Sequence, residues 1–114
     1  MALNVNDLFK TMIDAAAGAF GAQWTTARAF VPGELRKLAV QIADIAENVA
    51  KFQADPNEGF PPATGQVLLR MQRRSLEATL TAVTALTLIA VQDAINKILK
   101  ALKDAFGSVL DFVL

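Results

Sequence analysis

The densest group of side chains suited to binding chemistry is basic, because Arg70, Arg73 and Arg74 lie within five consecutive residues. A guanidinium offers a planar fork of donors that matches a carboxylate or a phosphate. No aromatic side chain is interleaved with the three arginines, so the cluster is a weak signal for nucleic acid. We expect Arg73 to pair with Glu77, four residues further along a helix, or with acidic residues of the helix predicted near residues 34–53. Binding of an anion or of a partner's carboxylate is the alternative.

The chain lacks the side chains that most often carry out catalysis. Histidine, cysteine and tyrosine are absent, which removes the commonest general base, the thiolate nucleophile and the phenolic acid, together with the usual zinc and di-iron ligand sets. The carboxylate pair Asp44 and Glu47 has helical spacing on a polar face, where a solvated surface is the simpler interpretation. Gly18 and Gly21 resemble a phosphate loop only superficially, because the lysine of that motif is absent. We therefore predict that the protein is not an enzyme and that it has no catalytic residue, no cofactor and no metal.

Charge and composition restrict the classes of partner. Eleven basic and eleven acidic residues cancel, so no global field attracts nucleic acid, and we predict that it is not a partner. Hydrophobic residues make up 54% of the chain and charged residues only 19%, against about 25% charged in ordinary domains. The apolar surplus must fill a core, cover a subunit interface or contact lipid.

Apolar residues recur at spacings of three and four, and no segment alternates as a strand does. We predict a single all-α domain over residues 1–114, a four-helix bundle with helices near residues 7–29, 34–53, 65–91 and 94–112. Residues 54–65, rich in proline and glycine, should form a long loop between the second and third helices. The helices near 34–53 and 94–112 should each present one amphipathic face. Whether the third and fourth helices are separate is open, and a break between Ile89 and Asn96 is our prediction.

Residues 78–92 contain no charge. Fifteen helical residues reach only about 22 Å, whereas a membrane span must cross about 30 Å. We interpret the stretch as the most completely buried helix of the bundle, with threonine hydroxyls bonding to carbonyls of the preceding turn. The N-terminal segment does not have the pattern of a secretory signal, so we expect a cytoplasmic protein, with membrane association as the alternative.

Two further segments leave alternatives open. The small residues from Ala15 to Ala22 allow another backbone to approach closely, and the partner could be a helix of this chain or a second subunit. The final segment, residues 95–114, has lysines on one side and a wide apolar face on the other. That pattern suits the last helix of a bundle, and it also resembles a helix that lies in a membrane interface.

The leading functional hypothesis is a non-enzymatic structural or interaction protein that self-associates as a homo-oligomer, with a further protein partner possible. The alternative is a membrane-active or lipid-surface protein that uses its C-terminal amphipathic helix, and a small-ligand binder is a third hypothesis. The candidate interaction surface consists of Phe20, Trp24, Arg70, Arg73, Arg74, Phe106 and Phe112.

Overall fold

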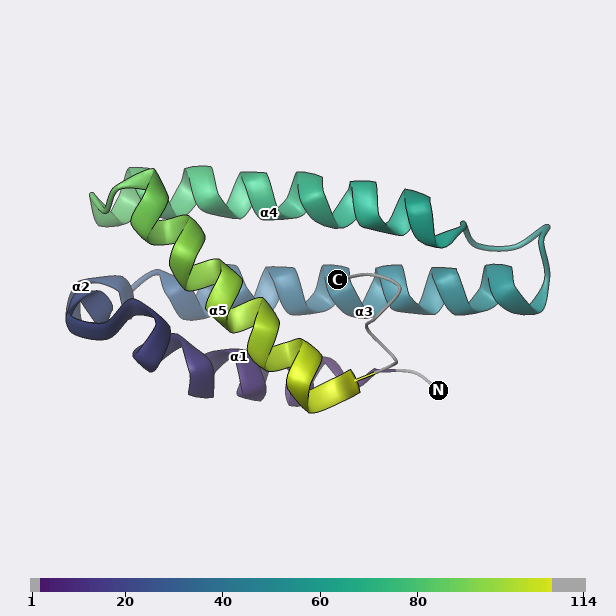
Figure 1. Cartoon of the computed structure of the whole chain (residues 1–114), viewed down its shortest axis with the longest axis horizontal. Coiled ribbons are helices and arrows are strands. Elements are labelled where there is room, and N and C mark those ends of the chain that lie inside the picture. Colours follow the sequence, from purple (N-terminus) through teal and green to yellow (C-terminus); the bar gives the residue numbers. More distant parts are fainter. Residues whose placement is uncertain (1–2, 108–114) are drawn as a thin grey trace.

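Four long helices and two short helical turns make up residues 3–107, which are the residues that the computed structural model describes (Figure 1). In chain order they are α1 (Val5–Phe20), η1 (Gly21–Gln23), α2 (Trp24–Ala27), α3 (Val31–Ala54), α4 (Pro62–Thr84) and α5 (Leu88–Phe106). No strand occurs within residues 3–107. The predicted all-α class is confirmed, and the four long helices form the expected bundle.

The N-terminal helix is shorter than predicted. Asn4 caps it by accepting hydrogen bonds from the backbone N–H groups of Asn6, at 2.8 Å, and Asp7, at 3.3 Å. The predicted continuation to residue 29 is wrong, because Gly21 takes a positive φ of 56° and ends α1, a conformation that favours glycine. The short turns η1 and α2 then redirect the chain into α3. Pro32 lies in the first turn of α3, where a missing N–H is tolerated.

The loop between α3 and α4 occupies only residues 55–61, so the predicted long loop over 54–65 is not confirmed. Pro62 starts α4 instead of remaining in the loop, because proline is compatible with a first helical turn. The loop folds back on α3, where the N–H of Phe60 donates to the carbonyl of Asn48 at 3.2 Å. Gly59, with φ of 61°, approaches so closely that a Cβ there would lie 2.0 Å from the same carbonyl oxygen.

The break between the last two long helices lies at residues 85–87, upstream of the predicted position. Ala85 adopts a left-handed conformation with φ of 59° and ends α4. The hydroxyl of Thr84 accepts from the N–H of Leu86, and the hydroxyl of Thr87 caps α5 by accepting from the N–H of Ala90 at 3.1 Å. Two helices therefore replace the single predicted helix over residues 65–91.

This break changes the burial of the uncharged stretch. Ile89 is 70% exposed, and Val83 and Leu88 are also exposed, so the prediction that this stretch forms the most completely buried helix is wrong. The predicted bonds from threonine to the preceding turn are confirmed, because the hydroxyls of Thr81 and Thr84 donate to the carbonyls of residues 77 and 80. No helix within residues 3–107 combines the length and the apolarity that a bilayer crossing requires.

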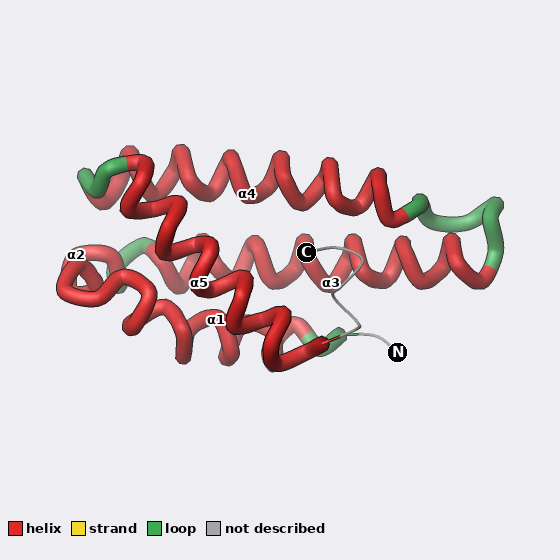
Figure 2. Tube along the Cα trace, in the orientation of Figure 1, coloured by secondary structure: helices red, strands yellow, loops and turns green. Residues whose placement is uncertain are grey.

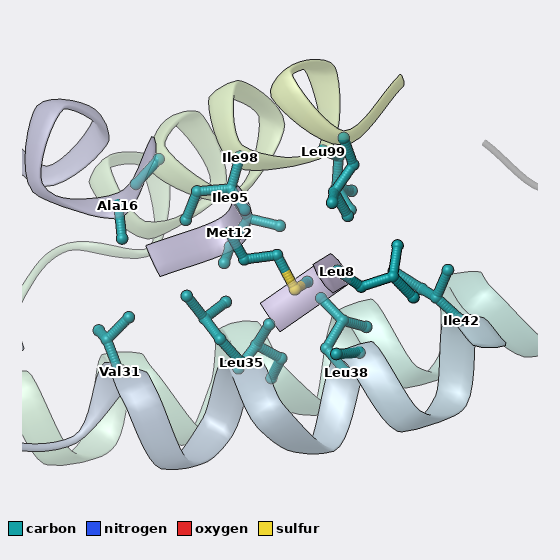
Figure 3. Close-up of a cluster of buried hydrophobic side chains, with 14 of the residues drawn as sticks. Leu8, Met12, Ala16, Val31, Leu35, Leu38, Ile42, Ile95, Ile98 and Leu99 are labelled. Atoms are coloured by element: carbon teal, nitrogen blue, oxygen red, sulfur yellow. The ribbon is translucent and has the colours of Figure 1, made fainter. Parts of the chain in front are cut away.

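The core lies between α1, α3, α4 and α5. The amphipathic faces predicted for the second and fourth helices are confirmed, because each helix buries one apolar side: Leu35, Leu38, Ile42, Ile45 and Val49 on α3, and Ile95, Ile98, Leu99 and Leu102 on α5. Helix α1 packs against both α3 and α5, and α4 packs against α3 and α5. Leu8 and Met12 of α1 project among the side chains of α3 and α5 (Figure 3).

Helices α3 and α4 run side by side as a long hairpin, whereas α5 leaves the end of α4 and crosses at a slant toward the start of α1 (Figure 2). The α4–α5 contact is therefore concentrated near the 85–87 turn, and the later part of α5 turns away from the first part of α4. This slant produces the candidate site.

Candidate functional site between α4 and α5

A polar network joins α4 to α5. Glu77 is only 6% exposed, and its Oε1 accepts from Nε of Arg73 at 2.9 Å while its Oε2 accepts from Nε2 of Gln92 at 3.3 Å. Nη2 of Arg73 also donates to Oδ1 of Asn96. The predicted pairing of Arg73 with Glu77 is confirmed, and the two α5 residues extend it across the helix interface.

The network satisfies a buried charge that would otherwise destabilise the fold, because a carboxylate removed from water requires charged or hydrogen-bonding partners. No buried side-chain nitrogen or oxygen within residues 3–107 lacks a hydrogen-bond partner. The sequence pattern did not identify Gln92, and it indicated Asn96 only as one bound of the predicted helix break. The available signal was their spacing of four residues, which places two amide side chains on one face of a helix.

A groove of about 460 Å³ opens beside this network. Its walls come from α4 and α5, and its lining residues are Gln66, Leu69, Arg70, Arg73, Leu99, Lys100 and Lys103. Leu69 and Leu99 are nearly buried and belong to the core, and Figure 3 shows Leu99 among the core side chains. The groove therefore has an apolar floor and basic walls.

The electrostatics of the groove are one-sided, since four cationic side chains and no carboxylate line it among the described residues. Lys100 pairs with Asp104 at 3.2 Å, but both side chains are largely exposed, and such pairs bind weakly. Arg70 and Lys103 make no ion pair or hydrogen bond within residues 3–107. The groove can attract an anion, and among the described residues its lining contains no histidine, cysteine or carboxylate that could act as a base, a nucleophile or a metal ligand.

The basic residues of the predicted interaction surface are divided by the structure. Arg70 and Arg73 line the groove. Arg74 is exposed but lies outside the groove lining. The three arginines therefore do not act as one cluster.

The aromatic residues of that predicted surface lie elsewhere. Phe20 is buried in the core, and the ring of Trp24 packs against it with centroids 6.3 Å apart. Phe106 is half-buried against the core, and Phe112 lies outside the described residues. The structure thus assigns Phe20, Trp24 and Phe106 to packing within the bundle.

A second candidate surface lies at one end of the bundle. The 28–30 turn and the 85–87 turn both lie at this end (Figure 2). Four of the seven large hydrophobic side chains that are exposed within residues 3–107 lie in or beside these two turns: Phe30, Val83, Leu88 and Ile89. We call these four residues the apolar end. Sequence analysis missed it because the whole uncharged stretch was assigned to the interior.

Comparison of the chain with protein-family models, with curated proteins and with solved structures found no match. The assignment of a function therefore depends on the groove and the apolar end.

Proposed function

We propose that the protein is a non-enzymatic interaction protein that self-associates through the apolar end. The observation that carries this proposal is the exposure of Leu88 and Ile89, at 48% and 70%, together with that of Val83 and Phe30 at the same end of the bundle (Figure 2). Exposed large apolar side chains gathered at one end of a protein are typical of protein contacts, because burial removes them from water.

Charge favours a second copy as the partner. Residues 78–92 carry no charge, and the segment 21–33 carries only Arg28. A complementary surface must be similarly uncharged and apolar, since an opposing charge would lose its hydration without gaining a counterion. A two-fold symmetric dimer satisfies this condition, because each copy presents the same surface to the other.

The composition supports a binding role over a catalytic one. The chain has no histidine, cysteine or tyrosine, and no group of residues within 3–107 has the arrangement of a metal site. The lipid-surface alternative relies on the apolar face of α5, but Ile95, Ile98 and Leu102 on that face are buried in the core. That alternative would require α5 to leave the bundle, so we do not adopt it.

Light scattering after size exclusion, over a dilution series, tests the proposal. We expect a mass that is a multiple of 12.2 kDa and that falls on dilution. The double variant Leu88→Gln/Ile89→Gln should weaken association by about tenfold or more, because two apolar side chains lose their burial. Val67→Gln/Met71→Gln is the matched control, since these two α4 residues are 49% and 61% exposed and lie outside the apolar end.

Two outcomes would contradict self-association through this surface. One is a wild-type mass of 12.2 kDa at every concentration up to hundreds of micromolar. The other is an equal weakening of self-association in the variant and in its control. Flotation of the monomeric protein with lipid vesicles, lost in the Leu88→Gln/Ile89→Gln variant, would assign the apolar end to a membrane surface instead.

A further inference from the structure

We infer that the groove between α4 and α5 is a binding site for a small amphipathic organic anion, with a carboxylate or phosphate head and a short aliphatic chain. The inference concerns a surface separate from the apolar end, so it does not depend on self-association. Its volume of about 460 Å³ lies within the range of about 300–1,000 Å³ that is common for small-ligand pockets.

The basic walls select the head group. Arg70 and Lys103 have no partner within residues 3–107, and they belong to the two different helices that border the groove. A bound anion would give both side chains a counterion. The electrostatic attraction between an exposed ammonium or guanidinium and an anion is weak in water. It is stronger in a groove that excludes part of the solvent.

Arg73 is the fixed member of the basic set. Glu77 and Asn96 hold its guanidinium through Nε and Nη2, and its side chain remains 29% exposed. Because its orientation is set before a ligand arrives, little conformational entropy is lost when the remaining N–H groups bind an anion. Glu77 therefore acts as a positioning residue for this cation.

The floor selects the rest of the ligand. Leu69 and Leu99 are 6% and 8% exposed, so their residual surface is apolar and lies between the basic walls. An inorganic anion would leave this surface in contact with water, whereas an aliphatic chain would cover it. No aromatic side chain lines the groove among the described residues, so stacking with a nucleobase is not favoured.

Calorimetric titration of the full chain tests the inference, with octyl phosphate below its micellar concentration as the probe and inorganic phosphate as the head-group control. We expect saturable binding of octyl phosphate and at least about tenfold weaker binding of inorganic phosphate. Affinity should rise by about two- to fourfold per methylene along a series from butyl to octyl phosphate.

Two matched variants locate the site. Arg70→Gln/Lys103→Gln should weaken octyl phosphate binding by about tenfold or more. Arg74→Gln/Lys97→Gln removes the same charges, an arginine from α4 and a lysine from α5, at exposed positions outside the lining. This control should bind like the wild type. All four side chains are exposed and make no hydrogen bond or ion pair within residues 3–107, and circular dichroism checks that each variant is folded.

Three results would overturn the inference. The first is no saturable binding of octyl phosphate, and the second is equal affinity for inorganic and octyl phosphate. The third is an equal loss of affinity for octyl phosphate in the groove variant and its control, which would indicate that the overall charge of the protein, and not the groove, binds the anion. If the first result is accompanied by flotation with anionic vesicles, the basic walls are assigned to a membrane surface instead.

Discussion

The buried pair of Arg73 and Glu77 should contribute far more to stability than an exposed pair at the same spacing. The chain offers a direct comparison, because Glu47 and Lys51 form an ion pair four residues apart at 3.4 Å. The side chains of that pair are 55% and 51% exposed, whereas those of Glu77 and Arg73 are 8% and 29% exposed. Burial is therefore the main difference between the two pairs.

The expected coupling energies follow from this difference. A hydrogen bond to a charged group in a buried setting contributes about 1.5–3 kcal/mol, and an exposed helical pair contributes about 0.3–0.5 kcal/mol. Helix orientation predicts the reverse order, since a glutamate that precedes its basic partner, as Glu47 does, has the better arrangement in an isolated helix. The comparison thus separates the effect of burial from that of helix orientation.

Double-mutant cycles measure both values, with Arg73→Met and Glu77→Gln in one cycle and Lys51→Met and Glu47→Gln in the other. Urea unfolding followed by helical circular dichroism gives the free energy of each variant, at two protein concentrations so that any contribution of association is identified. We expect coupling of about 1.5 kcal/mol or more in the buried cycle. Equal coupling in the two cycles, or a larger value for the exposed pair, would refute the argument from burial.

The same unfolding measurement checks three further expectations. Ile98→Val should destabilise the protein by about 0.5–1.5 kcal/mol, while Ile89→Val on the same helix should change it little, because Ile98 is fully buried and Ile89 is 70% exposed; equal effects would contradict the packing. Gly59→Ala should destabilise the protein by more than about 1 kcal/mol, because the added Cβ would overlap the α3 backbone. Gly18→Ala, in an open helical position, should stabilise the protein by about 0.5–1 kcal/mol. A loss of stability in both variants would be inconsistent with this geometry. Thr87→Ala should cost about 0.5–2 kcal/mol through loss of the α5 cap, and an unchanged midpoint would show that the cap does not contribute.

Periodicity predicted the parts of the fold that depend on burial alone. The stripe on α3 and the apolar series on α5 are buried as expected, since spacings of three and four leave one side of a helix apolar. Helix ends were less predictable. Gly21 and Ala85 end helices through positive φ angles, and an alanine in that conformation has no signal in the sequence.

The uncharged stretch shows why hydrophobicity alone misassigned the third helix. Thr84 and Thr87 provide the hydrogen bonds of a turn and a cap, although the same residues are compatible with a helix interior. For the groove, Arg73 and Glu77 were predictable from local spacing. The contributions of Lys100 and Lys103 depend on the slant of α5, which no local pattern encodes.

The packing of α1 against α5 has a consequence for the order of folding. Residues 21–87 lie between these two helices, whereas only the loop over residues 55–61 separates α3 from α4. Because the entropy of closing a chain segment increases with its length, the α3–α4 hairpin should form first and the α1–α5 pairing last. During synthesis, the burial of Leu8 and Met12 is therefore complete only after α5 has been synthesised. That interval is when the nascent chain is most exposed to aggregation, and chaperones that bind apolar segments would act there.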